Sequence, residues 1–342
     1  MALSCPIPWW QPSETSQPVA DTFAEMAAEG ITAIGVLLRA HPTENIYENI
    51  RKAFRNPNID VIVLTPLHWG STEQGCTGGK NIRWLNYPPE LFEWLYQTYG
   101  RQDKTVIVQS MEDDWTVAGT GCRNRDQCVT EDGRFDFYFN ACEAGTLALY
   151  DTDAETCEET ACDMVKMDRA EYLLQLYDER QAAVEAARAA HPGATLRVFH
   201  SIEVNFFNDE FYLVARDLIW RMDSPPDFVG LSLYARAGDV VEAFNNVVAW
   251  TRLPSYRVYI SEVGAKEGTQ PDGTVLVLPH QRERIVHVIE ELFALGAPIA
   301  LVWSWREIPF TGGHTGYSVI DTVTGEHLSG YDAIKELNET YR

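Results

Sequence analysis

The chain contains no apolar run long enough to cross a membrane. Its 342 residues are 45% hydrophobic, but no stretch reaches the roughly 18 consecutive apolar residues that a membrane-spanning helix needs. Residues 1–12 also lack the basic region and following apolar stretch that mark a secretory leader. We therefore expect no membrane partner for this chain.

Basic residues are scarce. The chain has 27 Lys and Arg against 50 Asp and Glu, which gives a formal net charge of −23. Nucleic acid is an unsuitable partner, because phosphate binding needs clustered Lys and Arg. A strongly anionic substrate is also disfavoured unless the site is locally basic. A surplus of acidic residues favours solubility, and nothing in it indicates the oligomeric state.

Two kinds of short motif are missing. No glycine-rich phosphate loop follows an early predicted strand, which argues against a doubly wound nucleotide-binding sheet. No HxH or HExxH motif occurs, which argues against a metal-dependent hydrolase. We therefore expect neither a cofactor nor a metal, although a metal site built on His68, His200 and nearby carboxylates remains an alternative.

The seven cysteines are unevenly distributed. Five of them lie between residues 122 and 162, in a polar stretch rich in Asp, Glu, Gly and Thr. We expect the six from Cys76 to Cys162 to form up to three disulfides, with Cys5 a free buried thiol. A zinc site is the alternative, but no pair has CxxC spacing. Disulfides indicate a secreted or periplasmic protein, and their connectivity stays open.

Strand and helix patterns alternate from end to end. The strands are short, β-branched and almost continuously apolar, as strands buried on both faces must be. Eight pairs, each of one strand followed by one helix, predict a (β/α)₈ TIM barrel. We therefore expect one catalytic domain over 1–342, with a cysteine-rich inserted loop over 116–165. A doubly wound open sheet is the rival architecture. The predicted strands span residues 2–9, 31–39, 60–69, 104–112, 196–205, 227–235, 257–264 and 298–305.

Ionisable and aromatic residues gather at the carboxyl ends of these strands, where a barrel of this kind holds its active site. An unpaired buried carboxylate costs several kcal/mol, so three glutamates in such positions indicate a function. A pair of carboxyl groups with aromatic platforms suits cleavage of a glycosidic bond, and hence a carbohydrate substrate. The candidates are Arg39, His68, Trp69, Glu112, Asp114, Trp115, His200, Glu203, Asn205, Tyr234, Glu262, Trp303 and Trp305.

Four segments, "YISEVG", "SLY", "VWSW" and "YQTYGRQDKTVIVQSMEDDW", resemble the clan-A retaining glycoside hydrolases, the superfamily of cellulases, mannanases and β-galactosidases. The resemblance implies that Glu262 is the nucleophile and Glu112 the acid/base. It further implies that Tyr234 hydrogen-bonds the nucleophile and that Trp303 or Trp305 forms the floor of a sugar subsite. "QSMEDDW" and "FHSIEVN" also resemble a little-characterised group of barrel proteins.

The chain departs from the family pattern ahead of the acid/base. Met111 stands where the family has an asparagine that holds the sugar 2-hydroxyl. Asp114 is expected to modulate the acid or to bind sugar hydroxyls. Glu203 competes with Glu112, because it moves to the fourth strand if residues 2–9 are not a barrel strand. A barrel that binds carbohydrate without catalysis is a further alternative.

Overall fold

A computed structural model describes most of the chain. The ranges it describes are 2–7, 19–39, 46–67, 90–110, 134–145, 156–205, 212–233, 239–265, 268–269, 275–276, 281–303, 319–321 and 324–341.

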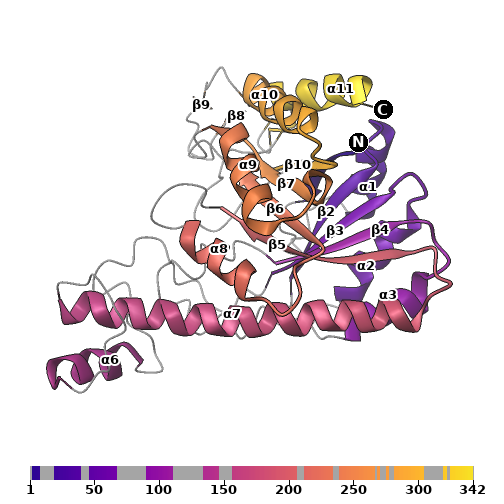
Figure 1. Cartoon of the computed structure of the whole chain (residues 1–342). Helices are drawn as coiled ribbons and strands as arrows, with labels where there is room; N and C mark the ends of the chain where they lie inside the picture. The colour runs from indigo at the N-terminus through magenta and orange to yellow at the C-terminus, as the bar shows by residue number, and fades with distance from the viewer. Residues whose placement is uncertain are drawn as a thin grey trace.

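Eight parallel strands form a closed barrel (Figure 1). The first strand pairs with both the second and the last, so the ring closes through the N-terminal segment. This confirms the predicted (β/α)₈ architecture and makes the strand that carries Glu203 the fifth. In barrel order the strands are β1 (Ala2–Ile7), β2 (Ala33–Arg39), β3 (Val61–Leu67), β4 (Thr105–Gln109), β5 (Arg197–Val204), β6 (Phe228–Leu233), β7 (Val258–Val263) and β10 (Ile299–Val302).

Helices surround the strands, as Figure 1 shows. They are α1 (Val19–Ala28), α2 (Ile46–Arg55), α3 (Glu90–Tyr99), α6 (Arg134–Glu143), α7 (Cys157–Ala190), α8 (Tyr212–Arg221), α9 (Val240–Thr251), α10 (Gln281–Ala294) and α11 (Ser329–Tyr341). A short 3₁₀ helix, η3 (Ser255–Arg257), precedes β7, and a small antiparallel pair, β8 (Gly268–Thr269) with β9 (Val275–Leu276), follows it.

Alternate residues of β2 to β7 and of β10 enter two different cores. One face contributes to a large cluster between the strands and the helices, which includes Ile62, Val106 and Ile260. The other face contributes to a smaller cluster inside the barrel. This period-two division follows from strand geometry and decides which polar side chains can meet inside the barrel. The interior cluster consists of Ala33, Val63, Ile107, Phe228, Tyr259, Ile299 and Leu301.

Helix α7 is longer than the 169–193 helix that the sequence predicts. It begins at Cys157, inside the expected loop, where Thr156 and Glu159 form a reciprocal capping box. In Figure 1 its first turns project beyond the barrel and pack beside α6. Part of the predicted inserted loop is therefore helical. The Thr-x-x-Glu capping box starts the helix ahead of the apolar repeat from which the helix was predicted.

The disulfide prediction is confirmed for three of the cysteines. Cys142 at the end of α6 bonds to Cys157 at the start of α7, with their Cα atoms 5.6 Å apart. Cys162 is also disulfide-bonded. Phe135, Ala161 and Val165 form a small hydrophobic core beside these bonds. The projecting pair of helices therefore has a core and a covalent link of its own, which we call the α6–α7 lobe.

Candidate active site

The candidate site lies inside the barrel, on β5, β6 and β7. Ser232 of β6 continues the inward-facing series of Phe228 and Gly230 and is buried. On β5 the inward series passes through Phe199 and Ser201 to Glu203, since the intervening Val198, Ile202 and Val204 enter the outer core. These positions lie toward the carboxyl ends of the strands, where barrel chemistry is found.

Strand β7 contains a β-bulge that turns Glu262 inward. Along β6, Leu231 is opposite Ile260, but the next residue, Ser232, is opposite Glu262. The register with β10 shifts over the same three-residue step. Since Ile260 and Val263 both enter the outer core, Ser261 and Glu262 together occupy the inward step between them. Without the extra residue, strict alternation would direct Glu262 outward.

Glu262 is held by a hydrogen bond from the neighbouring strand. The Ser232 hydroxyl donates to Glu262 Oε2 over 3.2 Å, and the glutamate is only 4% exposed. A buried carboxylate needs such partners to offset the loss of water. The bond fixes the orientation of the carboxyl group.

Glu203 makes a shorter contact across β6. The Ser261 hydroxyl donates to Glu203 Oε1 over 2.6 Å, and Glu203 is 1% exposed. The two residues belong to strands separated by β6, where Gly230 stands opposite Glu203. A Cβ on Gly230 would lie 2.6 Å from Ser261 Cβ, so only glycine leaves room for this contact.

Tyr259 forms the floor beneath the two glutamates. Its hydroxyl donates to Gln109 Oε1 and lies 3.2 Å from Ser201 Oγ. Burial, with a smaller contribution from the charges of Glu203 and Glu262, raises the pKa of the Tyr259 hydroxyl well above its usual value. Tyr259 therefore remains a neutral hydrogen-bond donor at any ordinary pH.

The structure places His200 in a different layer. Its side chain lies between β5 and α7, with Nδ1 3.2 Å from Gln181 Oε1. Three positions separate His200 from Glu203, an odd number, so the two residues face opposite sides of β5. On the same outer side, Arg180 Nη1 donates to Ser110 Oγ over 3.0 Å. His200 thus belongs to the attachment of α7 to β4 and β5, away from the interior carboxylates.

Burial of His200 predicts a specific acid sensitivity. Burial, and secondarily the charge of Arg180, lowers the pKa of His200 to about 3. The unfolded chain takes up this proton near pH 6.5 and the folded chain does not, so stability present above pH 6.5 is lost as pH falls. We expect His200→Gln to weaken this pH dependence by roughly 1 kcal/mol per pH unit between pH 6 and 4.

Urea unfolding of the wild type and of His200→Gln at several pH values measures this difference. A matched control is His287→Gln in α10, which makes the same substitution outside this layer. Parallel curves of unfolding free energy against pH for wild type and His200→Gln would contradict the assignment.

The remaining candidates differ in what the structure says of them. Arg39 ends β2. Asn205 directly follows β5 and is half-buried. Trp303 follows β10, and its backbone N–H donates to the Val263 carbonyl over 2.8 Å, which brings it beside the end of β7. The candidates outside the described residues are His68, Trp69, Glu112, Asp114, Trp115, Tyr234 and Trp305.

Sequence reasoning missed the polar residues that hold the two glutamates. Gln109, Ser232, Tyr259 and Ser261 were not among the candidates. Period-two counting from the apolar residues of β6 does place Ser232 inward. The inward direction of Glu262 depends on the bulge, for which the sequence offers no signal.

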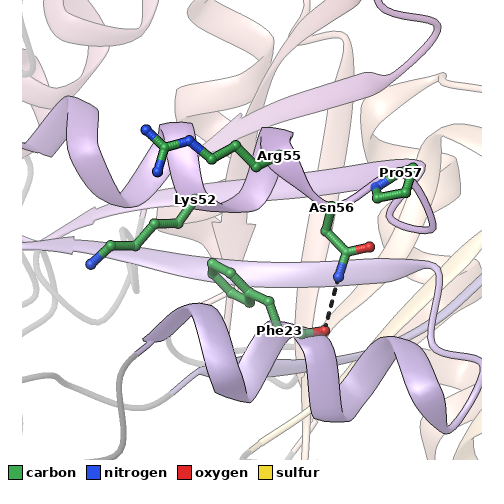
Figure 2. Close-up of a pocket in the computed structure, with 5 residues that line it drawn as sticks. All are labelled: Phe23, Lys52, Arg55, Asn56 and Pro57. Atoms are coloured by element: carbon green, nitrogen blue, oxygen red, sulfur yellow. Dashed lines mark hydrogen bonds between the residues drawn. The ribbon is translucent and has the colours of Figure 1, made fainter.

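A cavity of about 300 Å³ lies elsewhere, between α1 and α2. Figure 2 shows Asn56 reaching from the end of α2 to the carbonyl of Phe23 in α1, a hydrogen bond of 3.2 Å, with Lys52 and Arg55 nearby. The turn after α2 leads into the N-terminal end of β3, so this cavity opens at the end of the barrel opposite the glutamates.

Within the described ranges, no three His, Cys, Asp or Glu side chains come together as a ligand set for a metal ion. None of the helices in the described part of the chain is both long and apolar enough to span a bilayer.

The fold matches solved structures closely enough to define its class. A β-galactosidase from the Antarctic haloarchaeon Halorubrum lacusprofundi superposes with a TM-score of 0.58 at 13% identity, over 99% of this chain and 58% of the other. A Bacteroidetes-affiliated GH5 cellulase gives 0.54 at 12% identity, over 100% and 92%. The family 1 β-glucosidase from Thermotoga maritima gives 0.54 at 14% identity, over 94% and 85%.

The chain therefore has the TIM-barrel fold found in clan-A glycoside hydrolases, as the resemblance in its sequence implied. It spans little more than half the length of the β-galactosidase, and most of the length of the cellulase and the β-glucosidase. No protein-family model matches the chain, and comparison with curated proteins likewise gives no match.

Proposed function

We propose that this protein is a glycoside hydrolase that cleaves a glycosidic bond in an oligo- or polysaccharide with retention of anomeric configuration. The observation that carries the proposal is the bulge in β7, which turns a buried, hydrogen-bonded Glu262 into the barrel. The fold neighbours named as cellulase, β-glucosidase and β-galactosidase support a carbohydrate substrate.

The mechanism assigns one task to each of two carboxyl groups. Glu262 attacks the anomeric carbon and forms a covalent glycosyl ester, while Glu112 donates a proton to the departing oxygen. Glu112 then removes a proton from water, which attacks the same carbon and releases Glu262. This two-step route requires the two carboxyl groups to lie about 5–5.5 Å apart. Ser232 orients Glu262 throughout.

The acid/base assignment follows the strand order. With β1 in the barrel, the fourth strand is β4, and Glu112 comes three residues after its end at Gln109. Glu203 lies on the fifth strand, and one of its oxygens already accepts a hydrogen bond from Ser261. The proposal therefore keeps Glu112 as acid/base.

The sugar subsites are assigned to the aromatic and polar residues around the carboxyl ends of the strands. Trp303 and Trp305 would stack on the apolar faces of sugar rings, and Tyr234 would hydrogen-bond Glu262. The chain passes from the end of β4 through the α6–α7 lobe, so the lobe stands at the same end of the barrel as Glu262. The lobe would border the sugar subsites. Its disulfides suit a secreted or periplasmic enzyme.

The test is hydrolysis of a panel of aryl glycosides and polysaccharides, with the first-formed anomer followed by NMR. We expect at least one substrate to be cleaved, with the product keeping the configuration of the substrate. Glu112→Gln should slow cleavage of unactivated substrates by about 10²- to 10⁴-fold.

Three other outcomes would contradict the proposal in different ways. Inversion of configuration would remove the nucleophilic role of Glu262. Activity abolished by a chelator and restored by a divalent cation would favour the metal-dependent alternative. Sugar binding without turnover, unchanged in Glu262→Gln, would favour a non-catalytic carbohydrate-binding barrel.

A further inference from the structure

The extra residue of the β7 bulge is tied to a neighbouring glutamate. Ser261 is one of the two residues that share the inward step, and its hydroxyl donates to Glu203 Oε1 over 2.6 Å. This distance is at the short end for an O–H···O bond, as expected when the acceptor is a carboxylate. The contact is buried from both sides, because both residues are about 1% exposed.

A bulge needs such a tie because its extra residue interrupts the regular ladder. Two inward directions must be filled within one step, whereas regular alternation would return Glu262 to the outer face. A Ser261 side chain bonded to Glu203 fixes the backbone immediately before Glu262. Gly230 keeps the space between β5 and β7 open, so the tie can cross β6 directly. Glu262 directly follows Ser261 in the chain. The hydrogen bond from Ser261 to Glu203 therefore constrains the position of Glu262 through the backbone of one residue.

The same geometry is unsuited to proton transfer by Glu203. An acid/base must reach the glycosidic oxygen within hydrogen-bond distance, directly or through one water. Glu203 stands opposite Gly230 in the register, two positions before the Ser232 that faces Glu262. One of the Glu203 oxygens already accepts a hydrogen bond from the Ser261 hydroxyl, so this oxygen is engaged within the barrel and is not directed at a glycosidic oxygen.

We propose that Glu203 is a positioning residue for the nucleophile, acting through Ser261 to hold the bulge that directs Glu262 into the barrel. This inference rests on the proposed function, in which Glu262 is the nucleophile. It gives the fifth-strand glutamate a task distinct from that of Glu112.

The test compares Glu203→Gln with Glu203→Ala and Ser261→Ala. Glutamine keeps an Oε1 that accepts from Ser261, so Glu203→Gln should retain kcat/KM within about tenfold of the wild type. Glu203→Ala and Ser261→Ala each remove the tie and should lower kcat by roughly 10²-fold, as misplacement of a reacting group by about 1 Å does. Their double variant should be no worse than the poorer single variant, because both changes break one bond.

A second readout separates positioning from proton transfer. Loss of an acid/base slows aryl glycosides with poor leaving groups far more than those with good ones, because only the former need a proton. We expect Glu203→Gln and Ser261→Ala to show the wild-type dependence on the leaving group. Thr251→Val in α9, which also removes a buried hydroxyl bonded to Val247 O, is the matched control and should lose stability without losing kcat.

The outcomes are distinguishable. If Glu203→Gln loses 10²-fold or more on poor leaving groups and little on good ones, Glu203 is the acid/base and the inference is overturned, while the glycosidase proposal stands. Full activity in Ser261→Ala overturns the inference as well. If the wild type cleaves nothing in the panel, the proposed function fails and the inference falls with it.

Discussion

Glu262→Gln is expected to lower kcat/KM on the order of 10⁴-fold or more, with little change in the free energy of unfolding. Glutamine has the size of glutamate and its amide oxygen can still accept from Ser232, so the packing around position 262 is preserved. The amide nitrogen cannot form the glycosyl ester that the two-step route requires. The loss should therefore fall on kcat, with substrate affinity largely kept.

Initial rates across substrate concentrations, with thermal unfolding of each protein, measure both effects. Glu291→Gln on the exposed face of α10 is the matched control, because it makes the same chemical change away from the barrel interior. Activity of Glu262→Gln within tenfold of the wild type would exclude Glu262 as the nucleophile. Equal losses in both variants would indicate a general effect of reducing the negative charge.

Gly230→Ala is expected to destabilise the fold by about 3 kcal/mol and to impair catalysis at the same time. The new methyl group would stand 2.6 Å from Ser261 Cβ and 3.2 Å from Tyr259 Cζ. Both neighbours belong to β7, so relief of the clash must separate β6 from β7 or displace the bulge. Either movement alters the direction of Glu262.

Urea unfolding together with kcat measurements tests this expectation. Gly193→Ala is the matched control, because nothing lies within 4 Å of a Cβ at that position in the turn after α7. We expect it to change stability by less than about 1 kcal/mol. A Gly230→Ala variant as stable and as active as the wild type would show that β6 and β7 tolerate a side chain between them.

The barrel could be predicted because its strands have a distinctive sequence pattern. Segments such as "VIVL" in β3 and "TVIV" in β4 are β-branched and apolar on both faces, which a parallel strand buried between helices and interior requires. The N-terminal strand was the decisive element, since its pairing with β10 and β2 makes the count eight. The first turns of α7 were missed because their helical signal is a capping box within a polar, cysteine-rich stretch.

The site was predicted only in part, for a reason that lies in strand periodicity. His200 and Glu203 both stand near the end of β5, and their odd separation puts them on opposite faces. Simple alternation along "YISEV" would direct Tyr259, Ser261 and Val263 inward and Glu262 outward. That Glu262 is the nucleophile is implied by the resemblance to known hydrolases and stays a prediction, whereas the bulge that turns its side chain inward depends on contacts across three strands.

Helix α7 belongs to two cooperative units at once. With 34 residues it is about 50 Å long, well beyond the height of the barrel. Its later turns contribute Leu176, Tyr177 and Val184 to the main core, while its first turns share a separate core with α6. Hydrogen exchange along this one helix should therefore follow two regimes, global unfolding at its C-terminal end and local opening at its N-terminal end. Because the Cys142–Cys157 bond joins only the latter unit, a reducing environment would loosen the lobe beside the proposed sugar subsites while the barrel kept its fold.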